Sequence, residues 1–182
     1  MFSRAEALVL LNQYIQNQNL IKHMLAVEAC MRALALKFSE NSETWAMSGL
    51  LHDLDYNQTK DDFSQHGLIS AEILAKIQIS QDIIDSIKTH PGHFPRESLM
   101  SQALYCVDPL TGLIVAAALM HPDKKLKSVD VKFVLNRMKE KHFAKGANRE
   151  QINASGQLGI KLEEFISICL NAMQGIDNEL GL

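Results

Sequence analysis

The 182-residue sequence has little of what marks secreted or disulfide-stabilised proteins. Its three cysteines, Cys30, Cys106 and Cys169, are widely spaced and form no CxxC pair. An odd number of isolated cysteines does not make a disulfide framework and indicates buried thiols in a reducing compartment. Near the start, Arg4 and Glu6 stand where a signal peptide would need an apolar stretch. The sequence therefore predicts a soluble, cytoplasmic protein.

Long hydrophobic runs and strand-like patterns are also missing. The longest apolar run, Leu113 to Met120, is too short to cross a bilayer, so no membrane partner is expected. No stretch sustains the alternation of apolar and polar residues that is typical of strands, and no internal repeat is present. A net charge of −3 and an apolar content of 47% argue against disorder. The length suffices for one domain with a sizeable core.

What the sequence does contain is apolar residues at helical spacing, preceded by residues that cap helices. A capping box over residues 3–6 opens the first helix, and Asn19 and Ser64 are predicted caps of two others. Asp108 can cap a helix that begins at Pro109, or one long helix passes through this proline with a kink. Residues 55–63 are polar and predict a loop. We predict helices over residues 4–17, 19–38, 41–53, 64–77, 80–90, 97–107, 109–120, 128–140 and 161–173, the sixth and seventh forming one helix if the chain continues through Pro109, and a short segment over residues 149–154. The fold class is all-α, a compact single-domain helical bundle over residues 1–182.

Charge is distributed unevenly along the chain. Residues 124–149 hold nine of the 18 basic residues and two acids, Asp130 and Glu140, which gives this segment a net charge of +7. One interpretation is a solvated helix face, and the other is a basic strap that binds phosphate. Nucleic-acid binding is unlikely, because the chain as a whole is acidic and few aromatic residues lie among the basic ones.

Histidine and aspartate recur in a pattern that suits a metal. His52 and Asp53 stand side by side at the end of an apolar run, where the chain leaves the core and fixes its polar groups. A single histidine on an apolar helix is more often a core residue than a ligand. Here, however, the pair is accompanied by four further residues: His23, His66, His90 and Asp108. Imidazole nitrogen together with carboxylate oxygen is a ligand set for divalent metals of intermediate hardness.

The order of His, His-Asp and Asp on separate helices resembles the HD superfamily of metal-dependent phosphohydrolases, especially its small bacterial members. The resemblance covers about residues 20–120. These residues form the expected metal-site core, and a basic C-terminal helical extension is expected over residues 123–182. The matching segments are KH at 22–23, LHDLDY at 51–56, QHG at 65–67, IKTH at 87–90 and LYCVD at 104–108. The two middle segments resemble those of subfamilies that hold two metals.

The resemblance implies a ligand set and a chemistry. His23, His52, Asp53 and Asp108 would hold one divalent ion and leave positions open for water and a phosphoryl oxygen. His66 and His90 would add a second ion, with Asp53 bridging the two. The metal is one or two ions of Mn, Fe, Ni, Co, Zn or Mg. Such a site lowers the pKa of a bound water and neutralises charge on the phosphoryl group.

Other residues are weaker candidates. Asp53 and Asp55 are the expected catalytic residues, although Asp55 has the alternative role of ending the helix. His93 in a loop and Thr111, three residues after Asp108, are candidates to contact substrate. Two basic residues, Lys145 and Arg149, are candidates to hold phosphate.

The sequence departs from the family pattern in two places. After His90, where cyclic-dinucleotide phosphodiesterases carry Gly-Tyr-Pro, the chain has Pro91-Gly92-His93-Phe94-Pro95, and the tandem histidines of that subfamily are absent. This argues against that specific activity and for an incomplete second ligand shell. Pro109 directly after Asp108 is expected to alter the local helix.

The leading functional hypothesis is a metal-dependent phosphohydrolase that acts on a small phosphorylated metabolite, and we expect this metabolite to be a nucleotide. A di-iron oxygenase would use the same nitrogen and carboxylate ligands. A non-catalytic binding or regulatory module that retains a metal is the third hypothesis. A homo-oligomer is compatible with the apolar helix faces.

Overall fold

Helices account for all regular secondary structure of residues 2–182, the part of the chain that the computed structural model describes. The all-α prediction is therefore confirmed. The α-helices are α1 (Arg4–Tyr14), α2 (Gln18–Lys37), α3 (Ser42–Leu51), α4 (Tyr56–Thr59), α5 (Leu68–Leu74), α6 (Gln81–Thr89), α7 (Leu99–Met120), α8 (Val131–Lys139), α9 (Arg149–Asn153), α10 (Leu162–Gln174) and α11 (Asp177–Leu180). The 3₁₀ turns are η1 (Phe63–Gln65), η2 (Leu126–Ser128) and η3 (Ala154–Leu158).

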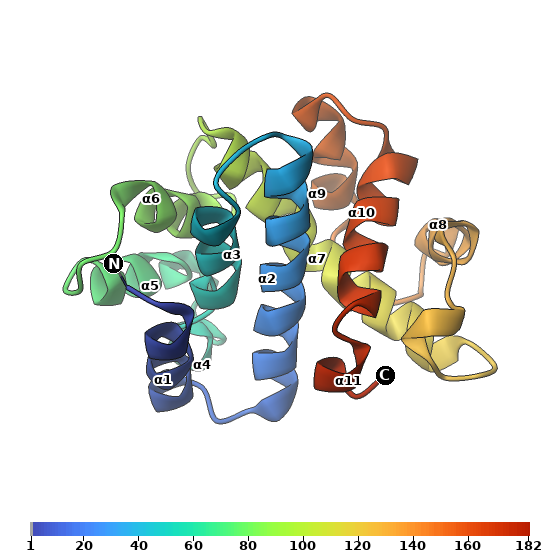
Figure 1. Ribbon diagram of the computed structural model, residues 1–182, viewed down its shortest axis with the longest axis horizontal. Helices are drawn as coiled ribbons and strands as arrows, with labels where there is room; N and C mark the ends of the chain where they lie inside the picture. The colour runs from blue at the N-terminus through green and yellow to red at the C-terminus, as the bar shows by residue number, and fades with distance from the viewer. Residues whose placement is uncertain (1) are drawn as a thin grey trace.

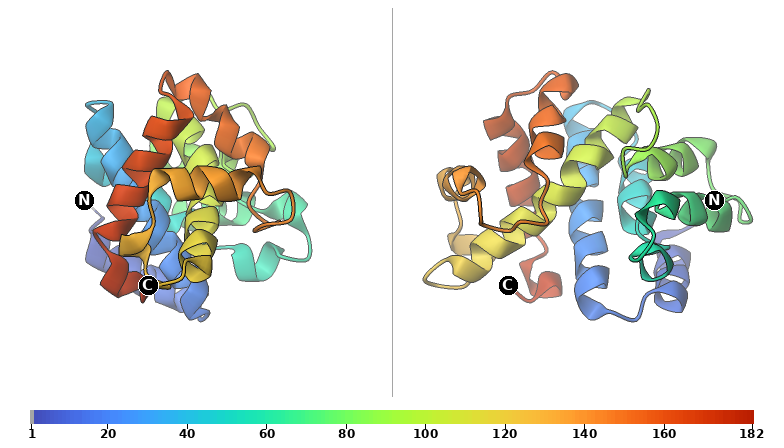
Figure 2. Two further views of the ribbon diagram at one scale, coloured as in Figure 1. Left: turned by 90° about the vertical axis from the view of Figure 1, so that its right-hand side faces the viewer. Right: turned by 180° about the vertical axis from the view of Figure 1, so that it is seen from behind.

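Helix α2 lies at the centre of the bundle, between α3 on one side and α10 on the other (Figure 1). It buries residues of its apolar stripe such as Met24, Met31 and Leu34 completely. Seen from behind, α7 crosses the molecule diagonally, and α8 lies at one edge next to its C-terminal half (Figure 2). The core is thus built around two long helices, and each of them carries a predicted metal ligand.

Helix α7 is continuous through Pro109, which confirms the alternative of one long helix. Asp108 is therefore not an N-cap but lies in the middle of this helix. By length and composition α7 could span a membrane. The prediction of no membrane-spanning segment considered only the apolar run 113–120, which is shorter than this helix. Most of its surface is covered by neighbouring helices, as in the core helix of many globular proteins. The continuity of α7 places Asp108 in the middle of a helix, with its side chain partly exposed.

Two glycines allow close approaches that bring the histidines together. A Cβ at Gly49 would lie 2.8 Å from the carbonyl oxygen of Val27, so glycine is required for α3 to pack directly on α2. Gly67 has φ +78°, and a Cβ there would lie 2.8 Å from the carbonyl oxygen of Ile87 at the end of α6. The first approach brings α3 against the helix that carries His23. The second brings together the segments that carry His66 and His90.

Local capping differs from the sequence-based expectation in places. The capping box of Ser3 and Glu6 is present as predicted. Helix α2 is capped by Asn17 rather than Asn19, because the Asn17 side chain accepts a hydrogen bond from the backbone N–H of Asn19 at 2.9 Å. The predicted polar loop 55–63 contains the short helix α4, and α5 begins after Gly67 instead of at Ser64.

Candidate metal centre

Six side chains from five segments of the chain converge at one point in the bundle. One comes from the first half of α2, two follow the end of α3, one follows η1, one follows α6, and one lies in the middle of α7. They are His23, His52, Asp53, His66, His90 and Asp108. All six predicted metal ligands are therefore neighbours in space. Four of them are buried, and only His23 and Asp108 have partly exposed side chains.

One half of the cluster is formed around His23 and His52. Their Nε2 atoms lie 3.2 Å apart. Asp108 Oδ1 is 3.2 Å from the Nε2 of His23 and 3.8 Å from that of His52. Ligands at about 2.1 Å from an octahedral ion are about 3 Å from their neighbours. The spacing therefore suits a single ion between these three residues.

The other half is formed around His66 and His90, whose Nε2 atoms also lie 3.2 Å apart. Asp53 Oδ1 is 3.2 Å from the first and 3.6 Å from the second. The same oxygen is 3.4 Å from His52 Nε2, and Oδ2 is 3.7 Å from His23 Nε2. Asp53 thus stands between the two halves and is within reach of a cation in either.

The backbone fixes the orientation of two imidazole rings. His52 Nδ1 lies 2.8 Å from the carbonyl oxygen of Gly49, and His90 Nδ1 lies 2.6 Å from that of Ile87. Because a carbonyl oxygen only accepts, both Nδ1 atoms carry the hydrogen. The Nε2 lone pairs of His52 and His90 are consequently turned toward the centre of the cluster.

Side chains orient the other two rings. His23 Nδ1 lies 3.1 Å from Thr111 Oγ1, whose hydroxyl donates to the backbone carbonyl of Asp108 at 2.9 Å. The Thr111 oxygen is therefore the acceptor for His23 Nδ1–H. His66 Nδ1 lies 2.8 Å from Asp55 Oδ1, which also accepts a hydrogen bond. Such partners behind a ligating histidine are typical of protein metal sites.

The donor set fits a divalent cation. Four Nε2 lone pairs face inward, and two pairs of them are only 3.2 Å apart. Lone pairs at this distance repel each other unless a positive charge lies between them. Nitrogen and carboxylate ligands together suit Mn, Fe, Co, Ni or Zn. Two sets of three residues each have ligand atoms that all lie within 4.8 Å of one another. One set is His23, His52 and Asp108, and the other is His52, Asp53 and His90.

Protons can take the place of a cation in this cluster. Burial lowers the pKa of His66, but hydrogen bonds to Asp53 and Asp55 outweigh it and raise the pKa to about 10. For His52, burial is outweighed by the charge of Asp53 and the hydrogen bond to Asp108, and its pKa rises to about 8. At Asp53, burial is outweighed by the charge of His52 and by hydrogen bonds from His66 and His90, which hold the pKa of this carboxyl well below its usual value. His90 behaves differently, since burial lowers its pKa.

We expect metal binding to release protons, because His52 and His66 must give up their Nε2 hydrogens to ligate. From the two raised pKa values, binding should release about two protons near pH 7 and about one near pH 9. Calorimetric titration of the apoprotein with Mn²⁺ in buffers of different ionisation enthalpy measures this number. Proton release that stays constant between pH 7 and pH 9 would contradict the assignment.

Asp55 lies behind His66 and does not line the cavity of the site. Its side chain is buried, accepts from His66 Nδ1 at 2.8 Å and accepts from the backbone N–H of Ser70 at 2.9 Å. The predicted catalytic contact of Asp55 with water is therefore not what the structure shows. Asp55 is a positioning residue that stands immediately before the first residue of α4, whereas the preceding helix α3 already ends at Leu51.

Asp55→Asn should lower metal affinity roughly 10- to 100-fold, the usual effect of losing a partner behind a ligating histidine. The amide can accept from His66 or from Ser70 but turns an N–H toward the other. Competition with a chromophoric chelator measures the affinity. Asp61→Asn, which changes an exposed carboxylate in the same loop, is the matched control. Equal metal affinity in both variants would show that Asp55 does not orient His66.

The cluster forms part of the wall of an open cavity of about 600 Å³. Segments before α2, at α4 and η1, along α7 and in the 144–151 stretch complete the wall. The lining residues beside the ligands are Asn17, Asn19, Leu20, Tyr56, Phe63, Pro91, Pro109, Gly112, Ala144, Gly146, Ala147 and Gln151. Within residues 2–182, no lysine or arginine lines this cavity. A substrate phosphate at the cluster would therefore depend on a bound cation for charge neutralisation.

The two predicted phosphate-binding residues lie outside the cavity wall. The Arg149 guanidinium donates to the backbone carbonyls of Ala144 at 2.7 Å and Ala147 at 2.6 Å, and also to that of Phe143. Its donors are used to hold the loop before α9, and the side chain does not line the cavity in which a phosphate would bind. Lys145 is exposed and stands between two residues that line the cavity. The guanidinium instead positions part of the cavity wall.

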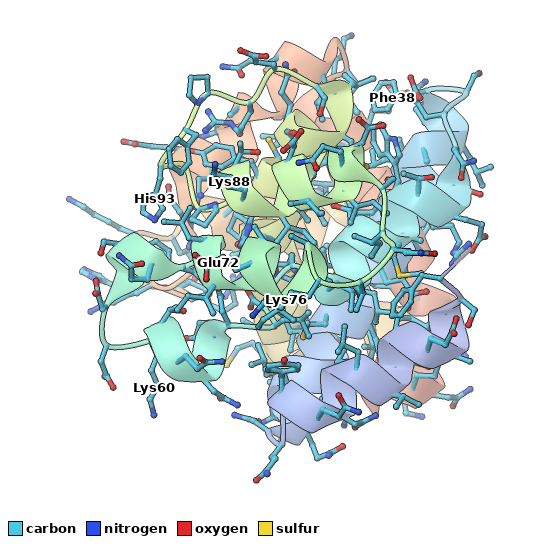
Figure 3. The ribbon with its side chains drawn as sticks, turned by 90° about the vertical axis from the view of Figure 1, so that its left-hand side faces the viewer. Phe38, Lys60, Glu72, Lys76, Lys88 and His93 are labelled. Carbon is cyan, nitrogen blue, oxygen red and sulfur yellow. The ribbon has the colours of Figure 1, made fainter. Side chains whose placement is uncertain are left out.

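The two predicted substrate contacts also differ from expectation. Thr111 is buried and contacts His23, so it positions a ligand rather than reaching the cavity. His93 is exposed, and its Nε2 donates to the backbone carbonyl of Phe63 at 2.9 Å. In Figure 3 it lies at the edge of the molecule, away from the core. Neither residue lines the cavity.

The sequence reading missed two aromatic residues that line the cavity, Tyr56 and Phe63. Both fall in the stretch that was interpreted as a polar loop. The sequence did contain a signal for them. Tyr56 and Phe63 are large aromatic residues in an otherwise polar stretch, and they follow His52-Asp53 closely enough in the chain to lie near the ligands.

The HD domain family matches this chain over residues 20–118, more than half of its length. The match includes all six residues of the cluster. No solved structure is significantly similar to the chain.

Curated relatives include ribonucleases Y from several bacteria. The one from Sulfurovum sp. is 27% identical over 136 residues, which are 73% of this chain and 27% of the relative. Those from Oleidesulfovibrio alaskensis and Enterococcus faecalis are 27% and 28% identical over 96 and 94 residues, about half of this chain and 18% of each relative. The chain thus spans about a quarter or less of the length of these relatives.

Proposed function

Because the chain belongs to the HD domain family of metal-dependent hydrolases, we propose that it is a phosphohydrolase that cleaves a phosphoester bond of a nucleotide. The observation that carries this proposal is the convergence of four Nε2 atoms and two carboxylates at the wall of an open 600 Å³ cavity. The cavity falls in the size range of small-molecule sites. It leaves one side of the cluster accessible to a phosphoryl group and to water.

A divalent ion bound there would polarise a phosphoryl oxygen and lower the pKa of a coordinated water. The residues of the chain have distinct parts in this reaction. Asp53 serves both halves of the cluster, and the partly exposed Asp108 faces the cavity. Thr111 and Asp55 hold His23 and His66 with their Nε2 atoms inward. These contacts preorganise the ligands, so little rearrangement is needed when substrate binds.

The amide side chains on the wall suit the remainder of a nucleotide. Asn19 and Gln151 come from opposite ends of the chain and line the same cavity. Amides donate and accept hydrogen bonds, so they match sugar hydroxyls and base edges. An uncharged wall also agrees with a substrate whose charge is confined to the phosphate bound at the cluster.

RNA is the second candidate substrate, favoured by the relatives that are named ribonuclease Y. A chain of nucleotides would extend beyond the cavity, and the basic segment 124–149 adjoins it through residues 144–147. The exposed lysines Lys139, Lys141 and Lys145 are suitably charged for flanking phosphates. This candidate revises the expectation that nucleic acid is an unlikely partner.

A substrate screen tests the proposal and separates its two forms. The protein is assayed with Mn²⁺, Fe²⁺, Co²⁺, Ni²⁺, Zn²⁺ or Mg²⁺ against nucleoside monophosphates, bis(p-nitrophenyl) phosphate and a short single-stranded RNA. Release of inorganic phosphate from the monophosphates supports the first form, and shortening of the RNA supports the second. His52→Gln should abolish either activity, whereas His121→Gln, which lies outside the cluster, should retain it.

Other outcomes would contradict the proposal. Activity that persists in His52→Gln would remove the cluster from the mechanism. Oxygen consumption that requires iron and an organic substrate would instead identify an oxygenase. Binding of a nucleotide that is unaffected by chelation, without turnover on any substrate, would identify a non-catalytic module.

A further inference from the structure

An aromatic pair that the proposed chemistry does not use stands beside the metal cluster. Tyr56 begins α4 and Phe63 begins η1, and both line the cavity. Tyr56 is 41% exposed and Phe63 is 54% exposed. Their exposed ring surfaces are therefore available to a ligand in this cavity.

The pair is close to the reacting centre. The Phe63 ring centroid lies 4.9 Å from that of His66, with the ring planes 36° apart. The Tyr56 ring lies 6.0 Å from His66 at a steep angle of 81°. His66 supplies one of the inward Nε2 atoms. A group stacked on Phe63 or Tyr56 is consequently about one sugar away from a phosphate at the cluster.

Phe63 is also held in place from outside. The His93 ring lies 5.7 Å from the Phe63 ring, and His93 Nε2 donates to the Phe63 carbonyl at 2.9 Å. In Figure 3 Lys60, which lies between α4 and η1 in the chain, and His93 are at the same edge of the molecule. This bracing fixes the segment without covering the ring, because Phe63 remains more than half exposed. A rigid, exposed aromatic ring is preorganised for stacking.

Scattered exposed aromatic residues are common and need no function. Phe94 is such a residue: it is 39% exposed, lies outside the cavity and has the Lys88 ammonium 5.0 Å from its ring centroid. Tyr56 and Phe63 differ because they share one cavity with the metal ligands. They are also uncharged and have no cation over their rings among the described contacts, which favours a neutral planar group over a second phosphate.

We propose that Tyr56 and Phe63 form a stacking subsite for the nucleobase of the substrate, a specificity determinant that rests on the proposed phosphohydrolase function. The phosphate is bound at the cluster, the sugar bridges the gap over His66, and the base lies against the aromatic pair. Stacking accepts any base, so the subsite selects nucleotides over sugar phosphates without selecting one nucleotide.

The test compares AMP with ribose 5-phosphate, both used as phosphonate analogues in which CH₂ replaces the 5′ oxygen so that neither is hydrolysed during the measurement; only the AMP analogue carries a base. Calorimetry with Mn²⁺ present measures their dissociation constants for the unchanged protein and for Phe63→Leu, Tyr56→Leu and Phe94→Leu. We expect AMP to bind about tenfold more weakly to Phe63→Leu, and this loss should exceed the loss for ribose 5-phosphate severalfold. Phe94→Leu should bind both ligands as the unchanged protein does.

Further measurements separate this inference from its alternatives. Metal content by elemental analysis should be the same in Phe63→Leu, and Phe63→Tyr should restore AMP binding, which excludes simple damage to His66. Equal weakening of AMP and ribose 5-phosphate, or no weakening of AMP, would overturn the subsite. If no phosphoester is hydrolysed by the unchanged protein, the proposed reaction fails, yet selective loss of AMP binding in Phe63→Leu still supports stacking.

Discussion

Asp53→Asn is expected to lower kcat about 10³-fold and to reduce the amount of metal that the protein retains. The Asp53 carboxylate lies within 3.7 Å of the Nε2 atoms of all four histidines and belongs to both halves of the cluster. Asparagine has nearly the same shape but no charge, so the fold should persist. Loss of several kcal/mol of charge stabilisation corresponds to roughly three orders of magnitude in rate.

The variant is measured by steady-state kinetics on the best substrate of the screen and by elemental analysis. Asp61→Asn, an exposed carboxylate eight residues further along, should match the unchanged protein in both. Thermal melting shows whether Asp53→Asn is folded. A folded Asp53→Asn protein that keeps more than about a tenth of the activity would rule out Asp53 as the shared carboxylate of the site.

Metal removal is expected to lower the Tm by about 8–16 °C near pH 9. A ligand at about 1,000 times its dissociation constant stabilises the folded state by about 4 kcal/mol, and each kcal/mol shifts the Tm of a protein of this size by about 2–4 °C. Without metal, inward lone pairs only 3.2 Å apart, such as those of His23 and His52, have no shared cation.

The loss of Tm should be smaller near pH 6. Neighbouring carboxylates raise the pKa of His52 to about 8 and of His66 to about 10, against the opposing effect of burial. A raised folded-state pKa adds stability that is present below the unfolded value of about 6.5 and is lost as the pH rises through 8 to 10. Differential scanning fluorimetry with EDTA or Mn²⁺ at both pH values measures this. A Tm that does not respond to chelation at pH 9 would argue against a structural contribution of the metal.

Much of the fold and of the cluster could be predicted from the sequence, because both depend on local chemistry. Apolar spacing locates α2 and α7, and the Ser3 capping box locates the start of α1. His23, His52 and Asp108 stand at positions that the family resemblance identifies, and the structure brings them together. Pro109 was ambiguous, since proline is tolerated both at the start of a helix and inside one that is held by its neighbours.

The residues around the cluster were harder to predict. Arg149 and Thr111 have side chains suited to substrate, but the distance between a donor and its acceptor is set by tertiary packing. Arg149 is directed to the carbonyls of its own loop, which no periodicity reveals. Tyr56 and Phe63 were not predicted to belong to the site but do line the cavity. They lie in a mostly polar stretch that predicts a surface loop. The sequence indicates which chemical groups are present, whereas the direction in which each side chain points depends on tertiary packing.

The four imidazoles differ in what would misalign them. The rings of His52 and His90 are oriented by carbonyls three residues earlier in the chain, so their alignment is a property of the main chain that side-chain substitutions nearby leave in place. The rings of His23 and His66 depend on Thr111 and Asp55, which single nucleotide changes can remove. Each half of the cluster therefore contains one histidine whose orientation tolerates substitution of neighbouring side chains, and one whose orientation is lost when a single neighbouring side chain is replaced.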